Sequence, residues 1–148
     1  MLKIFERMVF MKSLIIYATK YGCTEKAVRL LRTKIRGEVT AVNVTKDDVP
    51  SLSPFDTVII GGPIYAGRIH KSLSLYMHSK LDTLIKKRLA LFICAGEEDC
   101  SVIEKQIAEA FPEKLLQHAI AAESFGGDLY WDKLDSFTKL ILRMVKGI

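Results

Sequence analysis

Short apolar runs of strand length alternate along this chain with stretches of helical periodicity, and this alternation constrains the fold more than any other feature. The strand-like runs lie at about residues 13–18, 38–44, 57–61, 89–94 and 119–125. Between and after them, apolar residues recur every three or four positions, as in amphipathic helices. This order is typical of a parallel sheet that helices cover on both faces.

The number of strands and the handedness of their connections leave few topologies. Right-handed crossovers and five strands favour an α/β doubly wound parallel sheet in the order 2-1-3-4-5, with helices on both faces. A chain of 148 residues has the length of one domain. We expect a single domain over residues 12–148, preceded by an extension, residues 1–11, to which we assign no role.

Composition and charge exclude several classes of protein. The hydrophobic fraction of 49% and charged fraction of 26% are those of a globular domain. No apolar run is long enough for a membrane-spanning helix. The three cysteines are unevenly spaced and indicate neither a disulfide framework nor a zinc site, which favours a reducing, cytoplasmic compartment. The net charge of +5 favours an anionic partner, but without an aromatic-interleaved basic motif it does not indicate nucleic acid.

Ligands of such sheets bind beyond the carboxyl ends of the strands. The loop after the first strand, residues 19–24, carries two threonines and Gly22 at the start of a helix. Free backbone N–H groups and the helix dipole favour an anion there, so a phosphate fits. An ordinary helix cap beside a turn glycine explains this loop equally well when it is considered alone.

The loop after the third strand makes the ligand interpretation stronger. Residues 61–67 contain three glycines and a proline around one aromatic side chain, Tyr65. The glycines allow close approach of the backbone to a flat ligand, and Tyr65 offers a surface for a ring. Two such loops at adjacent strand ends predict a ligand that has both a phosphate and a ring system.

These loops together resemble the flavodoxin family, over nearly the whole chain from Lys12. The pattern Thr19-x-x-Gly22-x-Thr24 is similar to its phosphate loop, and Gly62-Pro63-Ile64-Tyr65-x-Gly67 is similar to its first flavin-ring loop. The resemblance implies a flavodoxin-like fold with FMN as cofactor. It implies three groups of FMN contacts: Thr19, Lys20, Tyr21, Gly22, Cys23 and Thr24 around the phosphate; Pro63, Ile64, Tyr65, Ala66 and Gly67 on one side of the ring; and Ala95, Gly96, Glu97 and Glu98 on the other.

One departure from the family concerns the last of these groups. Residues 95–99 contain no aromatic side chain, whereas many flavodoxins stack one against the flavin there. One face of the ring would then be open to a substrate.

Within the family, the chain resembles the menaquinone-dependent protoporphyrinogen dehydrogenases more closely. The resemblance rests on residues 17–22, 67–70 and 126–131, and it implies two-electron transfer from an organic donor, such as a porphyrinogen, to a quinone. Arg68 and His70 are then the candidate catalytic residues, with Lys71 meeting substrate carboxylates and Tyr130 and Trp131 as walls. A peripheral membrane contact and a homo-oligomer stay open as further interactions.

Other interpretations remain beside this one. The chain is alternatively a one-electron carrier that docks to protein redox partners, or an interaction domain that has lost FMN. The apolar face of the last helix, Leu134, Phe137, Ile141 and Met144, suits either the core or a membrane surface. The three histidines have no ligand spacing, so we expect no metal site. The spacing of Cys23 and Arg29 fits a cysteine phosphatase only formally, because Glu25 would repel the phosphate.

Overall fold

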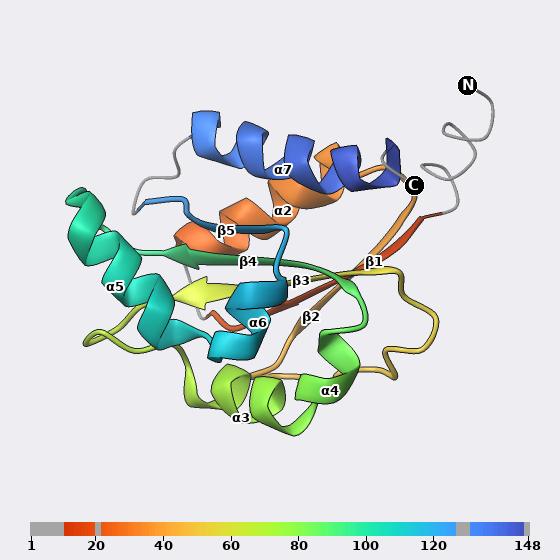
Figure 1. The fold of residues 1–148 in the computed structure, drawn as a ribbon, viewed down its shortest axis with the longest axis horizontal. Coiled ribbons are helices and arrows are strands. Elements are labelled where there is room, and N and C mark those ends of the chain that lie inside the picture. Colours follow the sequence, from red (N-terminus) through yellow and green to blue (C-terminus); the bar gives the residue numbers. More distant parts are fainter. Residues whose placement is uncertain (1–10, 20–21, 127–130, 147–148) are drawn as a thin grey trace.

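A five-stranded parallel sheet in the order β2-β1-β3-β4-β5 forms the centre of the molecule (Figure 1), which confirms the expected fold class. The computed structural model describes residues 11–19, 22–126 and 131–146. The strands are β1 (Lys12–Tyr17), β2 (Glu38–Asn43), β3 (Thr57–Pro63), β4 (Arg88–Cys94) and β5 (Ala121–Ser124). The helices are α2 (Cys23–Lys34), α3 (Lys71–Ser79), α4 (Leu81–Leu84), α5 (Cys100–Ala110), α6 (Glu113–His118) and α7 (Trp131–Lys146).

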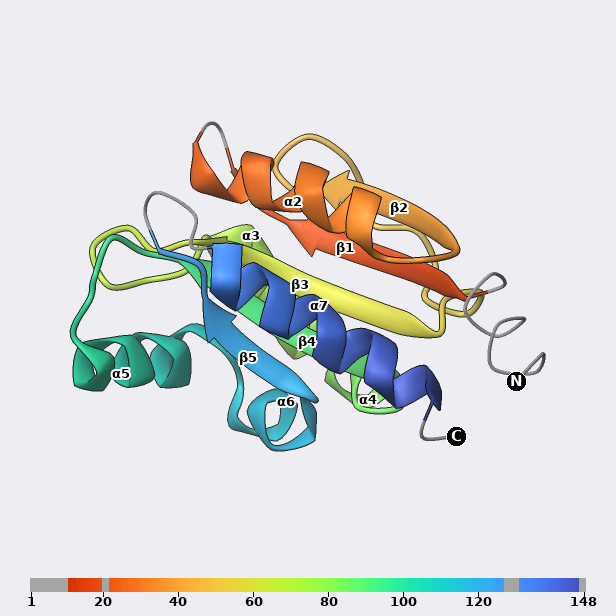
Figure 2. The same cartoon turned by 90° about the horizontal axis from the view of Figure 1, so that it is seen from above.

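The alternation of side chains along the strands divides the core into two layers. Ile15, Ile59 and Phe92 point to the face that α2 and α7 cover. Their neighbours in the chain point to the opposite face, where α3, α4 and α6 lie (Figures 1 and 2). Because both faces are covered, the three central strands are buried along almost their whole length, which explains their continuous apolar sequences.

The last helix packs against the sheet. Leu134, Phe137 and Ile141 of α7 are at most 1% exposed and belong to the same cluster as Phe92 and Phe125. The rings of Phe125 and Phe137 meet edge to face, with their centroids 5.1 Å apart. This confirms the core interpretation of α7 for these three residues; the side chain of Met144 lies outside the described ones. None of the helices that the structure describes is long and apolar enough to cross a membrane.

Four details differ from the sequence expectation. The helical stretch before β4 is two helices, α3 and α4, and a short helix, α6, separates α5 from β5. Strand β5 begins at Ala121 rather than at about 119, because the N–H of Ala119 still caps α6 through the Leu115 carbonyl. Met11 is 2% exposed and its carbonyl accepts from the N–H of Glu38, so the packed part of the domain includes Met11.

Candidate functional site

The loops that follow β1, β3 and β4 meet at the carboxyl edge of the sheet, where they enclose a cavity of about 380 Å³. The strand order puts β1 and β3 side by side at this edge and β4 beside β3. Nine residues line the cavity: Gly22, Cys23, Thr24, Pro63, Ile64, Tyr65, Cys94, Ala95 and Gly96. Eight of them were predicted from the sequence to contact the cofactor, and the structure brings these eight together.

The loop after β1 leads directly into the first turn of α2. Gly22 has a φ of 92°, a left-handed conformation that favours glycine, and α2 begins at the next residue. Thr24 is 1% exposed, and its Oγ1 has no oxygen or nitrogen partner among the described residues. Its neighbour is the Cys94 thiol, whose pKa is raised by the hydrogen bond with Cys23 and by burial, and which the Thr24 hydroxyl affects in the opposite direction. Two further predicted residues of this loop, Lys20 and Tyr21, lie outside the described part of the chain.

Asn43 holds the start of this loop in place through a hydrogen bond, and the sequence did not identify it as a site residue. It is 7% exposed at the end of β2, and its amide donates to the carbonyl of Thr19 at 3.0 Å. Its Oδ1 accepts from both the N–H and the hydroxyl of Thr45. The signal was a polar amide at the end of an apolar strand, next to the strand that bears the loop. Thr19 itself is buried, at 4% exposure.

A tight turn after β3 presents Tyr65. The backbones of Tyr65 and Arg68 exchange two hydrogen bonds of 3.0 Å. Between them, Ala66 and Gly67 have φ values of 52° and 76°, as in the type I′ turns of β-hairpins. Tyr65 is 63% exposed, so its ring is available to a ligand. Ala66 and Gly67 shape the turn, and neither is among the residues that line the cavity.

The loop after β4 is polar and contains no aromatic residue. Ala95 is buried and Gly96 is exposed at the cavity. A carboxylate oxygen of Glu97 accepts from the N–H groups of Glu98 and Asp99. Asp99 then caps α5, and its hydrogen bonds with Ser101 lower the pKa of its carboxyl. Glu97 therefore organises this loop, and neither Glu97 nor Glu98 is among the cavity-lining residues.

The two candidate catalytic residues lie just beyond Tyr65. His70 caps α3, because its Nδ1 accepts from the N–H of Ser72 at 3.1 Å. The ring proton of neutral His70 is therefore on Nε2. Arg68 is exposed and lines a second, larger cavity of about 740 Å³ with Lys71, Ser74 and Glu109. Trp131, a predicted wall, is 54% exposed, and Tyr130 lies outside the described residues.

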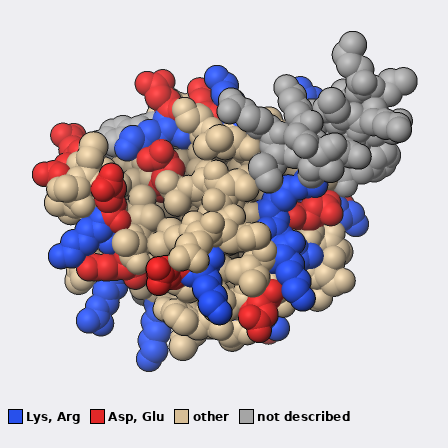
Figure 3. Space-filling model, in the orientation of Figure 1, with Lys and Arg blue, Asp and Glu red and all other residues tan. Residues whose placement is uncertain are grey.

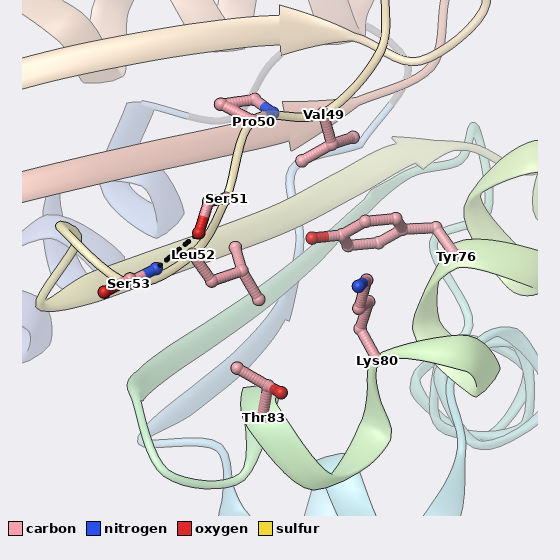
Figure 4. Close-up of a pocket in the computed structure, with 8 residues that line it drawn as sticks. All are labelled: Val49, Pro50, Ser51, Leu52, Ser53, Tyr76, Lys80 and Thr83. Atoms are coloured by element: carbon pink, nitrogen blue, oxygen red, sulfur yellow. Dashed lines mark hydrogen bonds between the residues drawn. The ribbon is translucent and has the colours of Figure 1, made fainter.

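A third cavity lies between the segment that precedes β3 and the helices α3 and α4 (Figure 4). It has a volume of about 380 Å³, and the segment of residues 49–53 before β3 forms one side of it. The Tyr76 hydroxyl points toward this segment, with Lys80 beside the ring. None of its lining residues belongs to the predicted ligand site, so the two cavities are separate.

Charge and geometry bear on the alternative chemistries. On the face shown in Figure 3, Lys and Arg side chains are intermixed with Asp and Glu, so the visible surface has no extended field of one sign. Cys23 and Arg29 lie six residues apart on α2, about 240° around the helix, so they cannot hold one phosphate between them. Within the described ranges, no three His, Cys, Asp or Glu residues are grouped to hold a metal ion.

Solved structures with similar folds are flavodoxins and larger flavoproteins. A short-chain flavodoxin associated with a non-canonical PDU bacterial microcompartment has a TM-score of 0.70 at 15% identity, over 92% of this chain and 99% of that one. Oxidised flavodoxin 1 from Bacillus cereus has a TM-score of 0.60 at 14% identity, over 93% and 99%. At these identities the likeness shows the fold.

A longer protein shows the same fold in one part of its chain. Rubredoxin oxygen:oxidoreductase from Desulfovibrio gigas has a TM-score of 0.61 at 16% identity. The match covers 97% of the present chain and only 38% of the oxidoreductase. No curated protein sequence matches the chain significantly.

The family is shown by the sequence itself. The model of the flavodoxin domain matches residues 14–148, which is most of the chain. Flavodoxins use FMN, and the site suits it. Among the described residues, the buried Thr24 hydroxyl at the helix start has no oxygen or nitrogen partner, and exposed Tyr65 lines the same cavity. This chain is therefore a member of the flavodoxin family, with FMN as its cofactor.

Proposed function

We propose that this chain is an FMN-dependent oxidoreductase that moves two electrons from a small organic anion to a quinone-type acceptor. Flavodoxins as a family transfer electrons to redox partner proteins, so a small-molecule donor is the specific element of this proposal. The observation that carries it is the cavity of about 740 Å³ beside the Tyr65 turn, where Arg68 and Lys71 supply positive charge.

Different loops would bind different parts of FMN. Thr19, Gly22, Cys23 and Thr24 would hold the FMN phosphate through hydroxyl and backbone N–H groups, with Lys20 and Tyr21 completing this loop. The turn formed by residues 63–67 would position the ring from one side, with Tyr65 against it. FMN supplies the electron chemistry when it is bound, and the protein supplies position and electrostatics.

The opposite side of the ring gives the donor its access. Ala95 and Gly96 border the cavity there with little side-chain bulk, and Glu97 and Glu98 follow them. A donor that carries carboxylates, as a porphyrinogen does, would be drawn toward Arg68 and Lys71. Glu109 lines the cavity of about 740 Å³ together with Arg68 and Lys71, and it would repel carboxylates of a donor that approached Glu109.

A redox titration of the FMN-loaded full chain tests the number of electrons. A single two-electron transition in the flavin absorbance supports the proposal. Two well-separated one-electron transitions would instead support the carrier function. Failure of the full chain to bind FMN at all would support the interaction-domain alternative.

Turnover assays with porphyrinogens and short-chain quinones test the substrates. The Arg68→Ala variant should raise KM for carboxylate-bearing donors severalfold and leave FMN affinity unchanged, because Arg68 holds the turn through its backbone. Glu104→Ala is the control, because Glu104 is exposed on α5 and lines neither of the two cavities. An unchanged KM in Arg68→Ala would remove Arg68 from substrate binding.

A further inference from the structure

Two cysteine sulfurs meet beside the cofactor cavity. Cys23 is the first residue of α2 and Cys94 is the last residue of β4, 71 positions later. Their Sγ atoms are 2.9 Å apart. A disulfide bond is about 2.05 Å long, so the sulfurs need to approach by only about 0.9 Å to form one. The fold thus juxtaposes two thiols from separate elements.

The two sulfurs differ in their surroundings. Cys94 is 5% exposed, and its hydrogen bond with Cys23, together with burial, raises the pKa of its thiol well above the ordinary value. Cys94 therefore stays protonated until a reaction partner removes its proton. Cys23 is only half-buried, and its Sγ also lies 3.0 Å from the Gly126 carbonyl after β5.

Access and electrostatics both select Cys23 as the first sulfur to react. Cys23 and Cys94 line the cavity of about 380 Å³, which opens between the loops after β1, β3 and β4. The positive end of the α2 dipole stabilises negative charge that develops on a sulfur at its first residue. Thiolates are the attacking species in thiol–disulfide exchange, so the more accessible sulfur at the helix start is the nucleophile.

We propose that Cys23 and Cys94 are a redox-active dithiol that is oxidised by low-molecular-weight disulfides of the glutathione type. The Cys23 thiolate attacks one sulfur of the small disulfide and breaks its S–S bond. A mixed disulfide forms, and the other half leaves as a thiolate that takes a proton from water. Cys94 then attacks the Cys23 sulfur, passes its proton to the departing thiolate, and releases the second small thiol. One protein dithiol and one small disulfide thus become one protein disulfide and two small thiols.

This dithiol is a redox couple separate from the flavin, although it lines the cavity that we assign to FMN. It adds a two-electron couple at the edge of the sheet where the cofactor binds. The bridge would tie the start of α2, which carries the phosphate loop, to the end of β4. Cys100 serves as an internal reference, because it is exposed at the start of α5 and is not among the residues of the cavity.

The test is exposure of the full chain, as purified, to buffers with a series of ratios of oxidised to reduced glutathione. Remaining thiols are blocked with an alkylating reagent, and the peptides are mapped by mass spectrometry. We expect a Cys23–Cys94 cross-linked peptide that increases with the ratio and disappears when reduced glutathione is added. The Cys100→Ser variant should form the same bridge to the same extent.

Single variants test the order of events. Cys94→Ser should accumulate glutathione on Cys23, because the resolving sulfur is gone. Cys23→Ser should leave Cys94 without glutathione, because Cys94 is buried. Stable glutathione on Cys23 of the unaltered chain, no reaction at either residue, or bridging to Cys100 instead would each overturn the proposal. Far-ultraviolet circular dichroism of each variant establishes that it is folded.

Discussion

Phe92 fills the space that a side chain on Gly61 would occupy. The two residues are paired across β3 and β4, and a Cβ added to Gly61 would lie 2.3 Å from the Phe92 ring. That ring also stacks on Phe125, with centroids 4.9 Å apart, so it has little freedom to move. Gly61 is therefore required by packing, whereas its place near the flavin loop had suggested a role in ligand approach.

The Gly61→Ala variant should be less stable by about 1–3 kcal/mol, because the added methyl group overpacks the core. Urea unfolding followed by circular dichroism measures this change. Gly96→Ala is the matched control, since a Cβ there has no neighbour within 4 Å among the described residues and the backbone is not left-handed. Equal stability of the two variants would mean that Phe92 relaxes easily.

The strand order and the two ligand loops were predictable because each rests on local sequence. Buried parallel strands require continuous apolar runs, and a helix that follows a strand is visible in the change of period. Both loops were found because glycines and threonines stand directly after strands. The two loops that we predict to bind the cofactor therefore meet where the strand order puts them, at the cavity lined by Thr24 and Tyr65.

Long-range relationships were not predictable in the same way. The Asn43 amide donates to the carbonyl of Thr19, 24 positions away in the chain. The sulfurs of Cys23 and Cys94 meet although the two residues are 71 positions apart. The sequence interpreted Cys94 as an ordinary core residue because nothing local distinguishes it from one. His70 presented the opposite problem, since a histidine at a helix cap has the same sequence context as one that faces a substrate.

Replacing Thr24 by valine should weaken FMN binding without unfolding the protein. The buried Thr24 hydroxyl has no oxygen or nitrogen partner among the described residues, so isosteric removal costs the apoprotein little. A hydrogen bond to a charged group contributes about 1.5–3 kcal/mol, so FMN affinity should fall roughly 10-fold or more. Quenching of flavin fluorescence measures the affinity for FMN and for riboflavin. Riboflavin lacks the phosphate, so it should bind the variant as tightly as it binds the unaltered chain. Thr24→Ser should restore FMN affinity.

The Tyr76→Phe variant should resist alkaline unfolding better than the unaltered chain. Burial raises the pKa of Tyr76 from its ordinary value of 10 to about 12. The unfolded chain therefore loses this proton first, so stability falls as the pH rises above 10 and continues to fall up to about 12. The variant should show a smaller decrease of Tm between these pH values; some decrease remains, because burial also raises the pKa of Tyr17.

Tyr76→Phe should also keep its stability at neutral pH within about 1 kcal/mol, because the hydroxyl that it removes is buried without a hydrogen-bond partner among the described residues. Tyr65→Phe, at an exposed position, controls for the loss of a tyrosine hydroxyl in general. An identical pH profile of Tm in Tyr76→Phe and the unaltered chain would show that Tyr76 ionises equally in both states.

Replacing Tyr65 by alanine should weaken FMN and riboflavin to the same degree. The exposed ring of Tyr65 is available to stack on the flavin, and stacking of an aromatic side chain on a base contributes about 1–3 kcal/mol. We expect affinity for both ligands to fall about 10-fold, measured by the same fluorescence titration as for Thr24→Val.

Tyr65→Phe keeps the aromatic ring and should bind both ligands normally. The backbone hydrogen bonds between Tyr65 and Arg68 hold the turn without the side chain, so the alanine variant keeps the turn in place. A loss confined to FMN would put Tyr65 near the phosphate instead of the ring. Equal losses for the two ligands in Tyr65→Ala, beside a loss only for FMN in Thr24→Val, would assign the two loops to the two halves of the cofactor.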